Sequence, residues 1–259
     1  MDKLSAWQAM RNAELGSEDS WLGMVGLYWL QRGLNRVGSS PDCAVVLPEG
    51  PALLGELHWR DDSLLWQAAD GQVQTMQTDL RGPPTEIKLG HLSFFVVDRD
   101  GQLAARVRDR QWAVKAPFAG LKYFAFAPAW SIVADWQAIE PPLVMEVPNV
   151  SGDLKAVSVD HRAIFQVAGK PVSLLPMSVG KEEVFFVFRD RTSGRETYGA
   201  GRFLKVPVPR DGKIVLDFNR AYNPPCAFTP FATCPLPPPE NWLPFAVVAG
   251  EMKPPDGAH

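Results

Sequence analysis

The chain has 259 residues, of which 46% are hydrophobic and 21% are charged, and its formal net charge is −3. This composition supplies enough apolar side chains for a sizeable core, and the length allows one large domain or two ordinary ones. The mild acidity argues against nonspecific binding to nucleic acid or to an anionic membrane surface, so neither is expected as a partner. The 24 prolines disfavour long helices and central strands, which favours a turn-rich, mostly β architecture.

Residues 1–33 are expected to form an N-terminal helical segment. Residues 4–14 are polar and contain alanine, with Leu4 and Trp7 on one face, which predicts a short helix packed on the main body. Ser20 is a suitable N-cap for a second short helix. The first 16 residues carry charges throughout and lack the apolar run of a signal peptide, and no apolar run is long enough to span a bilayer. A cytoplasmic location without a membrane partner is therefore expected.

Three cysteines, Cys43, Cys226 and Cys234, are a small and odd number, which favours reduced thiols in a chain of this kind. Seven residues separate Cys226 from Cys234, whereas zinc sites use closer pairs and four ligands. No metal and no cofactor is predicted. A thiol nucleophile would need a base such as His161, and the favoured alternative is that both cysteines pack as small apolar groups.

From residue 34 to residue 115, short apolar runs alternate with Gly, Pro and Asp. Asp61-Asp62 and the run Asp98–Gly101 each separate two such runs, which predicts two hairpins. The predicted strands are residues 43–47, 53–59, 64–68, 92–97 and 103–107.

The opening of this half, Leu34–Ser39 followed by Asp42–Pro48, resembles the start of a forkhead-associated (FHA) β-sandwich. The resemblance predicts an FHA-like sandwich over residues 34–115, and it implies phosphothreonine recognition. In that family the recognition residues are an Arg after the first Gly, a Ser and a His in the next loop, and a later Asn. Here Ser39 stands in place of the Arg, and His58 is the one later match. A sandwich without a phosphopeptide site is the main expectation.

The second half alternates again, after a loose boundary in residues 116–136. Repeated hairpins at short spacing predict a sandwich or barrel rather than βαβ units, so residues 116–252 are expected to form a second β-rich domain packed on the first. Residues 253–259 are expected to be a mobile tail. The predicted strands are residues 143–147, 155–159, 163–167, 172–175, 184–189, 196–198, 203–206, 213–218 and 245–249, with Asp160-His161-Arg162 as a turn.

The densest motif of the chain runs from Asp217 to Asn241, with Tyr198–Phe203 and Gly120–Phe124 upstream of it. Together these segments strongly resemble a family of uncharacterised bacterial and archaeal proteins, the domain of unknown function 1684 (DUF1684). The resemblance runs from about Trp21 to Glu251. It implies a family identity and no particular activity.

Physically, the motif is a proline-rich loop in which polar side chains alternate with aromatic ones. Prolines reduce the entropy that such a loop loses on ordering, so the loop can form a preorganised ligand wall. The alternative is a loop whose side chains satisfy one another and the local backbone. The candidate ligand-binding residues are Arg202, Asp217, Asn219, Arg220, Tyr222, Asn223, Cys226, Thr229 and Asn241.

Arg202 follows Gly199-Ala200-Gly201, whose small side chains let a ligand or another backbone come close. Its guanidinium can hold a carboxylate or phosphate with two parallel hydrogen bonds. It is therefore predicted to anchor an anionic ligand, or else to form a buried ion pair with Asp217. Arg189, Arg191 and Arg195 are expected on neighbouring strands, most simply as solvated charges.

The sequence thus leaves two functions open. The leading one is a protein that binds a small, anionic molecule at the C-terminal motif loop, with catalysis left open. The alternative is a noncatalytic interaction or scaffold module that uses the FHA-like sandwich. A closed pocket with converging polar groups would favour the first, and a flat apolar patch the second.

Overall fold

The computed structural model describes residues 3–116, 118–150, 152 and 154–254. The chain divides into two compact units, one of Ala13–Pro117 and one of Met1–Asn12 with Phe118–His259. We call them the N-terminal and the C-terminal unit. Both are built mainly of strands, so the predicted mostly β fold class is confirmed. No helix among the described residues is long and apolar enough to cross a membrane.

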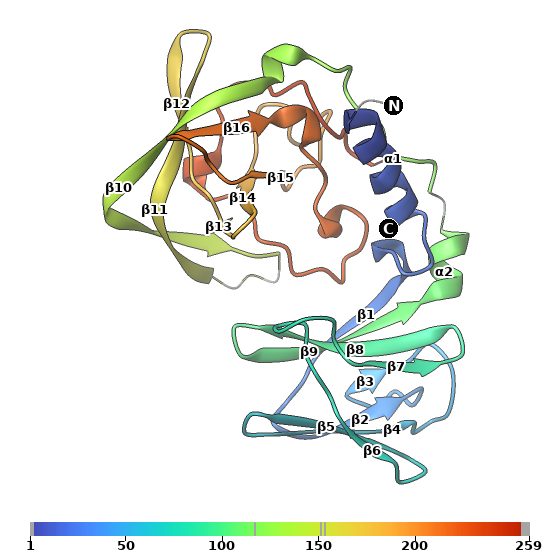
Figure 1. The fold of residues 1–259 in the computed structure, drawn as a ribbon. Coiled ribbons are helices and arrows are strands. Elements are labelled where there is room, and N and C mark those ends of the chain that lie inside the picture. The colour runs from blue at the N-terminus through green and yellow to red at the C-terminus, as the bar shows by residue number, and fades with distance from the viewer. Residues whose placement is uncertain (1–2, 117, 151, 153, 255–259) are drawn as a thin grey trace. The chain divides into compact units, whose positions relative to one another are not determined.

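The N-terminal unit consists of two sheets, which Figure 1 shows as two layers. One has the order β1-β9-β8-β7 and the other the order β3-β2-β4-β5-β6, and every pair is antiparallel except β2 with β3. The strands are β1 Met24–Trp29, β2 Gly33–Gly38, β3 Val45–Val46, β4 Gly55–Arg60, β5 Ser63–Ala68, β6 Val73–Thr75, β7 Glu86–Leu89, β8 Leu92–Arg99 and β9 Gln102–Asp109.

Side chains from both sheets form one core, which includes Val37, Leu57 and Trp66 of one sheet and Phe94 and Val107 of the other. The two predicted hairpins are present as β4–β5 and β8–β9. The unit is therefore a β-sandwich, and its likeness to the FHA family stays a prediction. Helix α2 Arg110–Lys115 follows β9, and Asp109 caps it by accepting from the backbone N–H groups of Gln111 and Trp112.

The predicted helical segment 1–33 is only partly helical. Helix α1 Lys3–Leu15 is present, but the second helix is a single 3-10 turn, η1 Trp21–Gly23, and Ser20 makes no side-chain cap bond. Met24–Trp29 is strand β1, which pairs with β9 and packs Val25 and Tyr28 against the sandwich core. The predicted strand 43–47 shrinks to Val45–Val46 between the two prolines that flank it.

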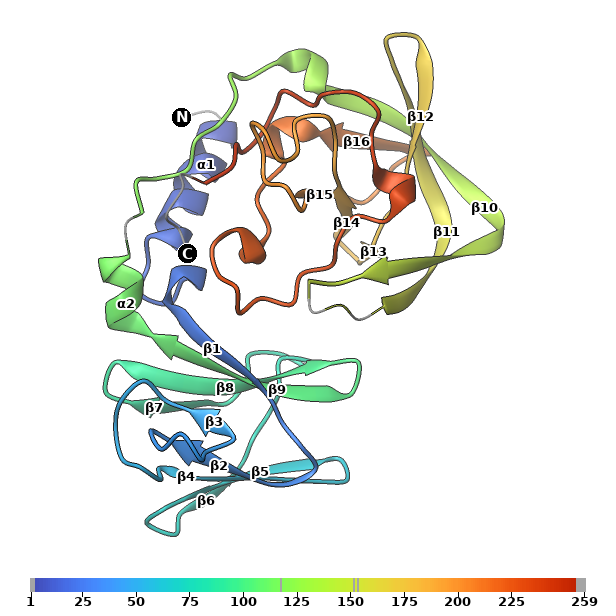
Figure 2. The same cartoon turned by 180° about the vertical axis from the view of Figure 1, so that it is seen from behind.

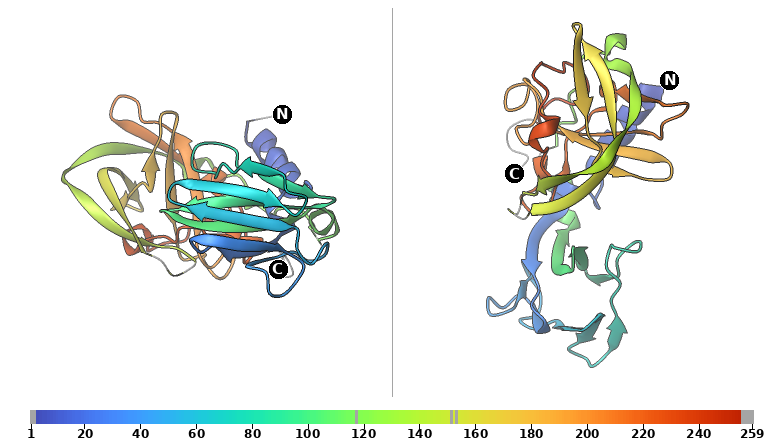
Figure 3. Two further views of the ribbon diagram at one scale, coloured as in Figure 1. Left: turned by 90° about the horizontal axis from the view of Figure 1, so that it is seen from below. Right: turned by 90° about the vertical axis from the view of Figure 1, so that its left-hand side faces the viewer.

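The C-terminal unit also has two sheets, with the orders β12-β11-β10-β16 and β13-β14-β15. Figure 3, right, shows β10 and β11 as a long and strongly curved hairpin. Its strands are β10 Ser131–Pro148, β11 Leu154–Val167, β12 Lys170–Leu174, β13 Ser178–Val179, β14 Glu183–Phe188, β15 Arg202–Pro207 and β16 Lys213–Asp217. Its 3-10 turns are η2 Pro128–Trp130, η3 Phe218–Arg220, η4 Pro225–Ala227 and η5 Pro239–Asn241.

The core of this unit joins both sheets to the motif loop. Phe186 and Phe188 of β14, Leu216 of β16 and Phe218 of the loop are all fully buried, and Phe218 packs edge-on against Phe188. Figure 2 shows the chain after β16 continuing as irregular coil with short turns. The loop is thus part of the core, and its conformation is fixed by burial as well as by prolines.

A predicted turn and a proline pair of the C-terminal unit both lie inside strands. Asp160-His161-Arg162 belongs to β11, where the His161 ring stacks on Trp136 of β10 with centroids 5.3 Å apart. Glu140-Pro141-Pro142 lies inside β10, where the register with β11 shifts between Ala138 and Leu143. Prolines are tolerated there because a bulge removes their ladder hydrogen bonds.

The predicted strands 196–198 and 245–249 do not form. Residues 190–197 close into a compact turn, in which the Thr192 carbonyl accepts from the backbone N–H groups of residues 195, 196 and 197. Residues 245–249 are extended but pair with no strand of the structure described here. The carbonyls of Val247 and Ala249 accept from the buried Arg202 side chain instead.

Candidate functional site

Arg202, the first residue of β15, is buried completely. Its Nη2 donates to Asp190 Oδ2 at 2.8 Å and to the Val247 carbonyl at 2.9 Å. Its Nη1 donates to the carbonyl of Ala249 and, at 3.4 Å, to that of Glu251. The guanidinium therefore satisfies the carbonyls of residues 247, 249 and 251, while the Arg191 and Phe124 N–H groups bond the carbonyls of Phe245 and Gly250.

The partner of Arg202 is Asp190, not the predicted Asp217. The Asp190 side chain is 0% exposed, and its Oδ1 accepts from Thr192 N, Thr192 Oγ1 and Val247 N at 2.8, 2.6 and 3.2 Å. Both carboxylate oxygens are thus occupied. Of the two predictions for Arg202, the buried ion pair is the one the geometry supports, with a different partner.

Gly201 explains the small residues before Arg202. Its φ is +98°, and a Cβ there would lie 2.5 Å from the Phe188 carbonyl oxygen and 3.0 Å from Pro237 Cγ. The close approach that the sequence predicted is therefore made by the protein's own backbone and by the motif loop.

Asp217 and Asn219 close the start of the loop on themselves. Asp217 Oδ1 accepts from the backbone and side-chain N–H groups of Asn219, at 3.2 and 3.0 Å. The Asn219 amide also donates to the Ala127 carbonyl and accepts from the Ala127 N–H. Arg220 is exposed, with its guanidinium over the Trp7 ring of α1 at 5.4 Å.

Tyr222 and Asn223 join the loop to α1 and to the chain end. The Tyr222 ring lies under the Arg11 guanidinium at 4.9 Å. The Asn223 N–H donates to Glu251 Oε2 at 2.7 Å, and Arg11 Nε donates to the other oxygen of Glu251 at 3.0 Å. Burial raises the pKa of Glu251, and the Arg11 charge and these hydrogen bonds oppose that rise. No pattern in the sequence predicted that this glutamate is buried.

Cys226 and Cys234 are buried, and neither forms a disulfide, in agreement with the predicted reduced thiols. The Cys226 N–H donates to Cys234 Sγ at 3.3 Å, and Tyr198 Oη donates to the Cys226 carbonyl at 2.8 Å. The hydrogen bond with the Cys234 thiol lowers the pKa of Cys226, and burial opposes this. His161 instead hydrogen-bonds Asp160 at 2.9 Å.

Thr229 and Asn241 also form hydrogen bonds with backbone groups. Thr229 Oγ1 accepts from the Phe231 N–H at 3.2 Å. Asn241 is fully buried; its Oδ1 accepts from the Leu175 N–H, and its Nδ2 donates to the carbonyls of Leu175 and Val187, all at 2.8–2.9 Å. The nine predicted residues are thus brought into one region, where most of them bind the protein's own groups.

A cavity of about 510 Å³ lies beside this region, where β14 ends. Three arginines line it, Arg189, Arg191 and Arg195, and Trp242 and Pro244 supply apolar surface. We call it the arginine cavity; its lining is completed by Asp190, Ser193 and Leu243. None of the nine predicted residues lines this cavity, although Trp242, the residue after Asn241, does.

The arginine cavity carries unbalanced positive charge. Among the described residues, no carboxylate forms an ion pair with Arg189, Arg191 or Arg195. Asp190 is the one acidic residue of the lining, and Arg202 neutralises it from inside the protein. The cavity therefore presents three guanidinium groups against a wall whose own carboxylate is already paired.

Secondary structure fixes the walls of the arginine cavity. Arg189 forms a bridge with Trp242, in which the Arg189 N–H donates to the Asn241 carbonyl at 3.2 Å and its carbonyl accepts from Leu243 N at 2.8 Å. The Arg189 guanidinium lies over the Trp242 ring at 4.9 Å. The sequence analysis named these arginines but missed Trp242 and Asp190. The spacing of Asp190 and Thr192 is typical of an Asx turn, and it could have indicated a structural role for Asp190.

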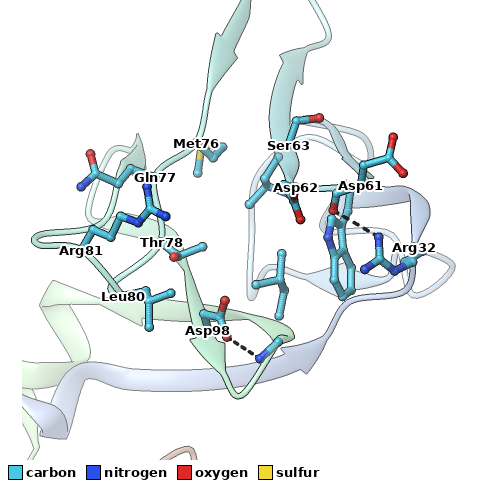
Figure 4. A pocket seen from close by; sticks show the side chains of 14 residues that line it. Arg32, Asp61, Asp62, Ser63, Met76, Gln77, Thr78, Leu80, Arg81 and Asp98 are labelled. Carbon is cyan, nitrogen blue, oxygen red and sulfur yellow. Dashed lines mark hydrogen bonds between the residues drawn. The ribbon is translucent and has the colours of Figure 1, made fainter.

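A second cavity, of about 490 Å³, lies in the N-terminal unit (Figure 4). Its buried lining includes Trp59, Leu64 and Met76, so part of its surface is apolar. Figure 4 shows Arg81 on one side of it and Asp61 and Asp62 on the other, so its charges are mixed. This cavity does not favour one sign of ligand charge, unlike the arginine cavity.

Comparison with known proteins agrees with the resemblance seen in the sequence. The family described as "Protein of unknown function (DUF1684)" matches residues 116–252, which is more than half of the chain. A similar solved structure is the solution NMR structure of an uncharacterized protein from Haloarcula marismortui. It is 34% identical, the match covers 52% of this chain and 77% of that one, and the TM-score is 0.43. No curated protein matches the chain.

Proposed function

We propose that this chain, which belongs to the DUF1684 family, binds a small anionic molecule in the arginine cavity of its C-terminal unit. The observation that carries the proposal is the set of three arginines around one cavity, none of them paired with a carboxylate of the described residues. A cytoplasmic location, predicted from the sequence, is kept as part of this proposal.

Charge supports an anion as the occupant. Guanidinium groups that share one cavity repel each other, and a bound anion removes this repulsion while it accepts charge-assisted hydrogen bonds. Arginine suits phosphate and carboxylate groups in particular, because its planar fork matches two of their oxygens. The proposed ligand therefore carries at least one phosphate or carboxylate group.

Size supports a small molecule. A volume of about 510 Å³ lies in the range of ligand pockets in proteins, which is roughly 300–1,000 Å³. Such pockets combine apolar walls with a few well-placed polar groups. Trp242, Leu243 and Pro244 provide the apolar walls here, and the arginines and Ser193 provide the polar groups.

The motif loop has a supporting role in this proposal. Asn241 bonds the loop to Leu175, which follows β12, and to Val187 of β14, so the next residue, Trp242, is held at the cavity. The pair Arg202–Asp190 holds the turn 190–197, which carries Arg191 and Arg195. Asn241 and Arg202, which the sequence predicted to contact the ligand, would thus position the cavity residues that contact it.

Thermal melting with inorganic phosphate, pyrophosphate and citrate tests the proposal. A ligand that binds only the folded protein raises its melting temperature, and we expect at least one of these anions to do so in low salt. The variant with Arg189→Gln, Arg191→Gln and Arg195→Gln should lose this rise. An equal rise in the triple variant, or no rise with any of the three anions in the wild type, would refute the proposal.

A second candidate function places a partner in the N-terminal cavity, as the alternative of an interaction module suggests. The observation that favours it is a partly apolar cavity that is lined by both acidic and basic side chains. A dipeptide with both charges and an apolar side chain fits such a lining. Arg81→Gln should then abolish dipeptide binding measured by calorimetry, whereas the triple glutamine variant should not change it.

A further inference from the structure

Trp242 is an exposed aromatic residue at the arginine cavity. Its side chain belongs to the lining, and the residue is 53% exposed. A tryptophan buries a large apolar area when it is covered, so an exposed one in a concave, charged site is a favourable contact for a ligand.

The exposed indole is also held in place. Trp242 Nε1 donates to the Pro237 carbonyl at 2.9 Å, and the Trp242 backbone N–H donates to the Pro239 carbonyl at 3.1 Å. The bridge with Arg189 fixes the backbone from the other side. A ring with so little freedom loses little entropy when a ligand covers it.

Arg189 occupies part of the ring surface. Its guanidinium lies 4.9 Å from the ring centroid, which is a cation–π distance. The ring area that stays exposed lies next to guanidinium groups with no carboxylate partner among the described residues. The site therefore offers an aromatic surface and a positive charge side by side.

We propose, on the premise that the arginine cavity binds an anion, that its ligand is an aromatic anion: a planar ring stacks on Trp242 while a phosphate or carboxylate group binds Arg191 and Arg195. Stacking is tolerant of ring identity because every aromatic ring has a π-face. The proposal thus names a class of ligand, a flat ring with one or more acidic groups.

A second copy of the chain is a poorer occupant. In a twofold interface the same patch meets itself, so the three arginines of each copy would face like charges. An aromatic anion covers the indole and neutralises the arginines at once, so it fits both observations together.

Calorimetric titration with phenyl phosphate and cyclohexyl phosphate tests this inference. The two probes carry the same anionic group on rings of similar size, and only phenyl phosphate has a π-face. We expect phenyl phosphate to bind the wild-type protein about tenfold more tightly, given the usual strength of stacking on an aromatic side chain. Trp242→Leu should abolish this preference, and Trp242→Phe should keep part of it.

The outcomes distinguish a failure of the aromatic-ligand inference from a failure of the anion site. Equal affinities for the two probes, both weakened in the triple glutamine variant, would overturn the aromatic inference and leave the anion site intact. Binding that is unaffected in the triple variant would overturn the anion site itself. A phenyl preference that persists in Trp242→Leu would place the stacking elsewhere and also overturn the inference.

Discussion

Two sets of arginines lie within a short stretch of the C-terminal unit and serve opposite purposes. Arg202 is inside the protein, where one carboxylate and three backbone carbonyls take its hydrogen bonds. Arg189, Arg191 and Arg195 line a cavity and have no carboxylate partner among the described residues. The arginine that the motif made most conspicuous thus holds the structure, whereas Arg191 and Arg195 are exposed at a cavity.

The difference follows from where each side chain can find acceptors. A buried guanidinium needs acceptors for most of its donors, and both terminal nitrogens of Arg202 find carbonyls in residues 247–251. A guanidinium at a cavity has water as its default partner and can exchange it for an anion. Substitution should therefore cost stability at Arg202 and ligand affinity at the cavity.

The largest expected effect is on stability at Arg202. Arg202→Ala removes one partner of a buried ion pair and leaves Asp190 uncompensated, which should cost on the order of 3–5 kcal/mol in urea unfolding. Lys205→Gln on the same strand is the matched control, since its pair with Glu183 is about half exposed and should contribute at most about 1 kcal/mol. Similar losses for the two variants would break the comparison.

A smaller loss is expected at Asn241. Its side chain makes three hydrogen bonds to the backbone of Leu175 and Val187, and Asn241→Ala leaves these buried groups without that partner. We expect a loss of about 2–3 kcal/mol in the free energy of unfolding. The exposed neighbour Glu240 provides the control variant Glu240→Ala, which should unfold like the wild type. An unchanged Asn241→Ala variant would show that the loop does not depend on this amide.

A partly buried ion cluster in the N-terminal unit gives an intermediate case. Burial opposes ionisation of Glu86, but hydrogen bonds from Ser93 and Arg110 and the charges of Arg110 and Arg108 outweigh it, so the pKa of Glu86 lies below its ordinary value. A carboxylate with a lowered pKa stabilises the folded state above its unfolded-state pKa and loses this contribution as pH falls through its folded-state pKa.

Glu86→Gln should therefore cost about 1–2 kcal/mol at neutral pH, and its difference from the wild type should shrink as the pH falls below about 4.5. Chemical denaturation at a series of pH values measures this difference. A difference that stays constant down to acidic pH would mean that the charge of Glu86 contributes nothing.

The smallest expected effect is on stability at the arginine cavity. Arg191→Gln and Arg195→Gln remove exposed charges that repel each other, so each should change the free energy of unfolding by less than about 0.5 kcal/mol in either direction. Thermal melts without ligand check this. A marked loss of stability would show that these arginines, like Arg202, stabilise the fold.

Much of the fold could be predicted because short apolar runs and turn residues define hairpins locally. The hairpins β4–β5 and β8–β9 and the strands β14, β15 and β16 follow that pattern. The pattern failed at Asp160-His161-Arg162, whose polar residues suggest a turn. In the structure, Trp136 of the neighbouring strand stacks on His161, which is a tertiary contact that local sequence does not encode.

The sequence singled out the motif loop, but it could not show which groups the side chains of this loop contact. The sequence identified the motif loop and Arg202, because prolines and glycines mark backbone that is held in place. It could not show that Asp190 rather than Asp217 pairs with Arg202, since this depends on how the turn 190–197 meets residues 245–251. For the same reason the role of Trp242 emerged only from the cavity that it lines.

The most direct test of the central claim compares two arginines that each lie over a tryptophan ring. Arg189 lies over Trp242 in the arginine cavity, and Arg220 lies over Trp7 in the loop that the sequence favoured. Calorimetric titration of pyrophosphate into Arg189→Gln and Arg220→Gln separates the two locations. We expect at least tenfold weaker binding for Arg189→Gln and wild-type affinity for Arg220→Gln, because a charge-assisted hydrogen bond contributes about 1.5–3 kcal/mol. Wild-type affinity for Arg189→Gln together with lost binding for Arg220→Gln would contradict the account.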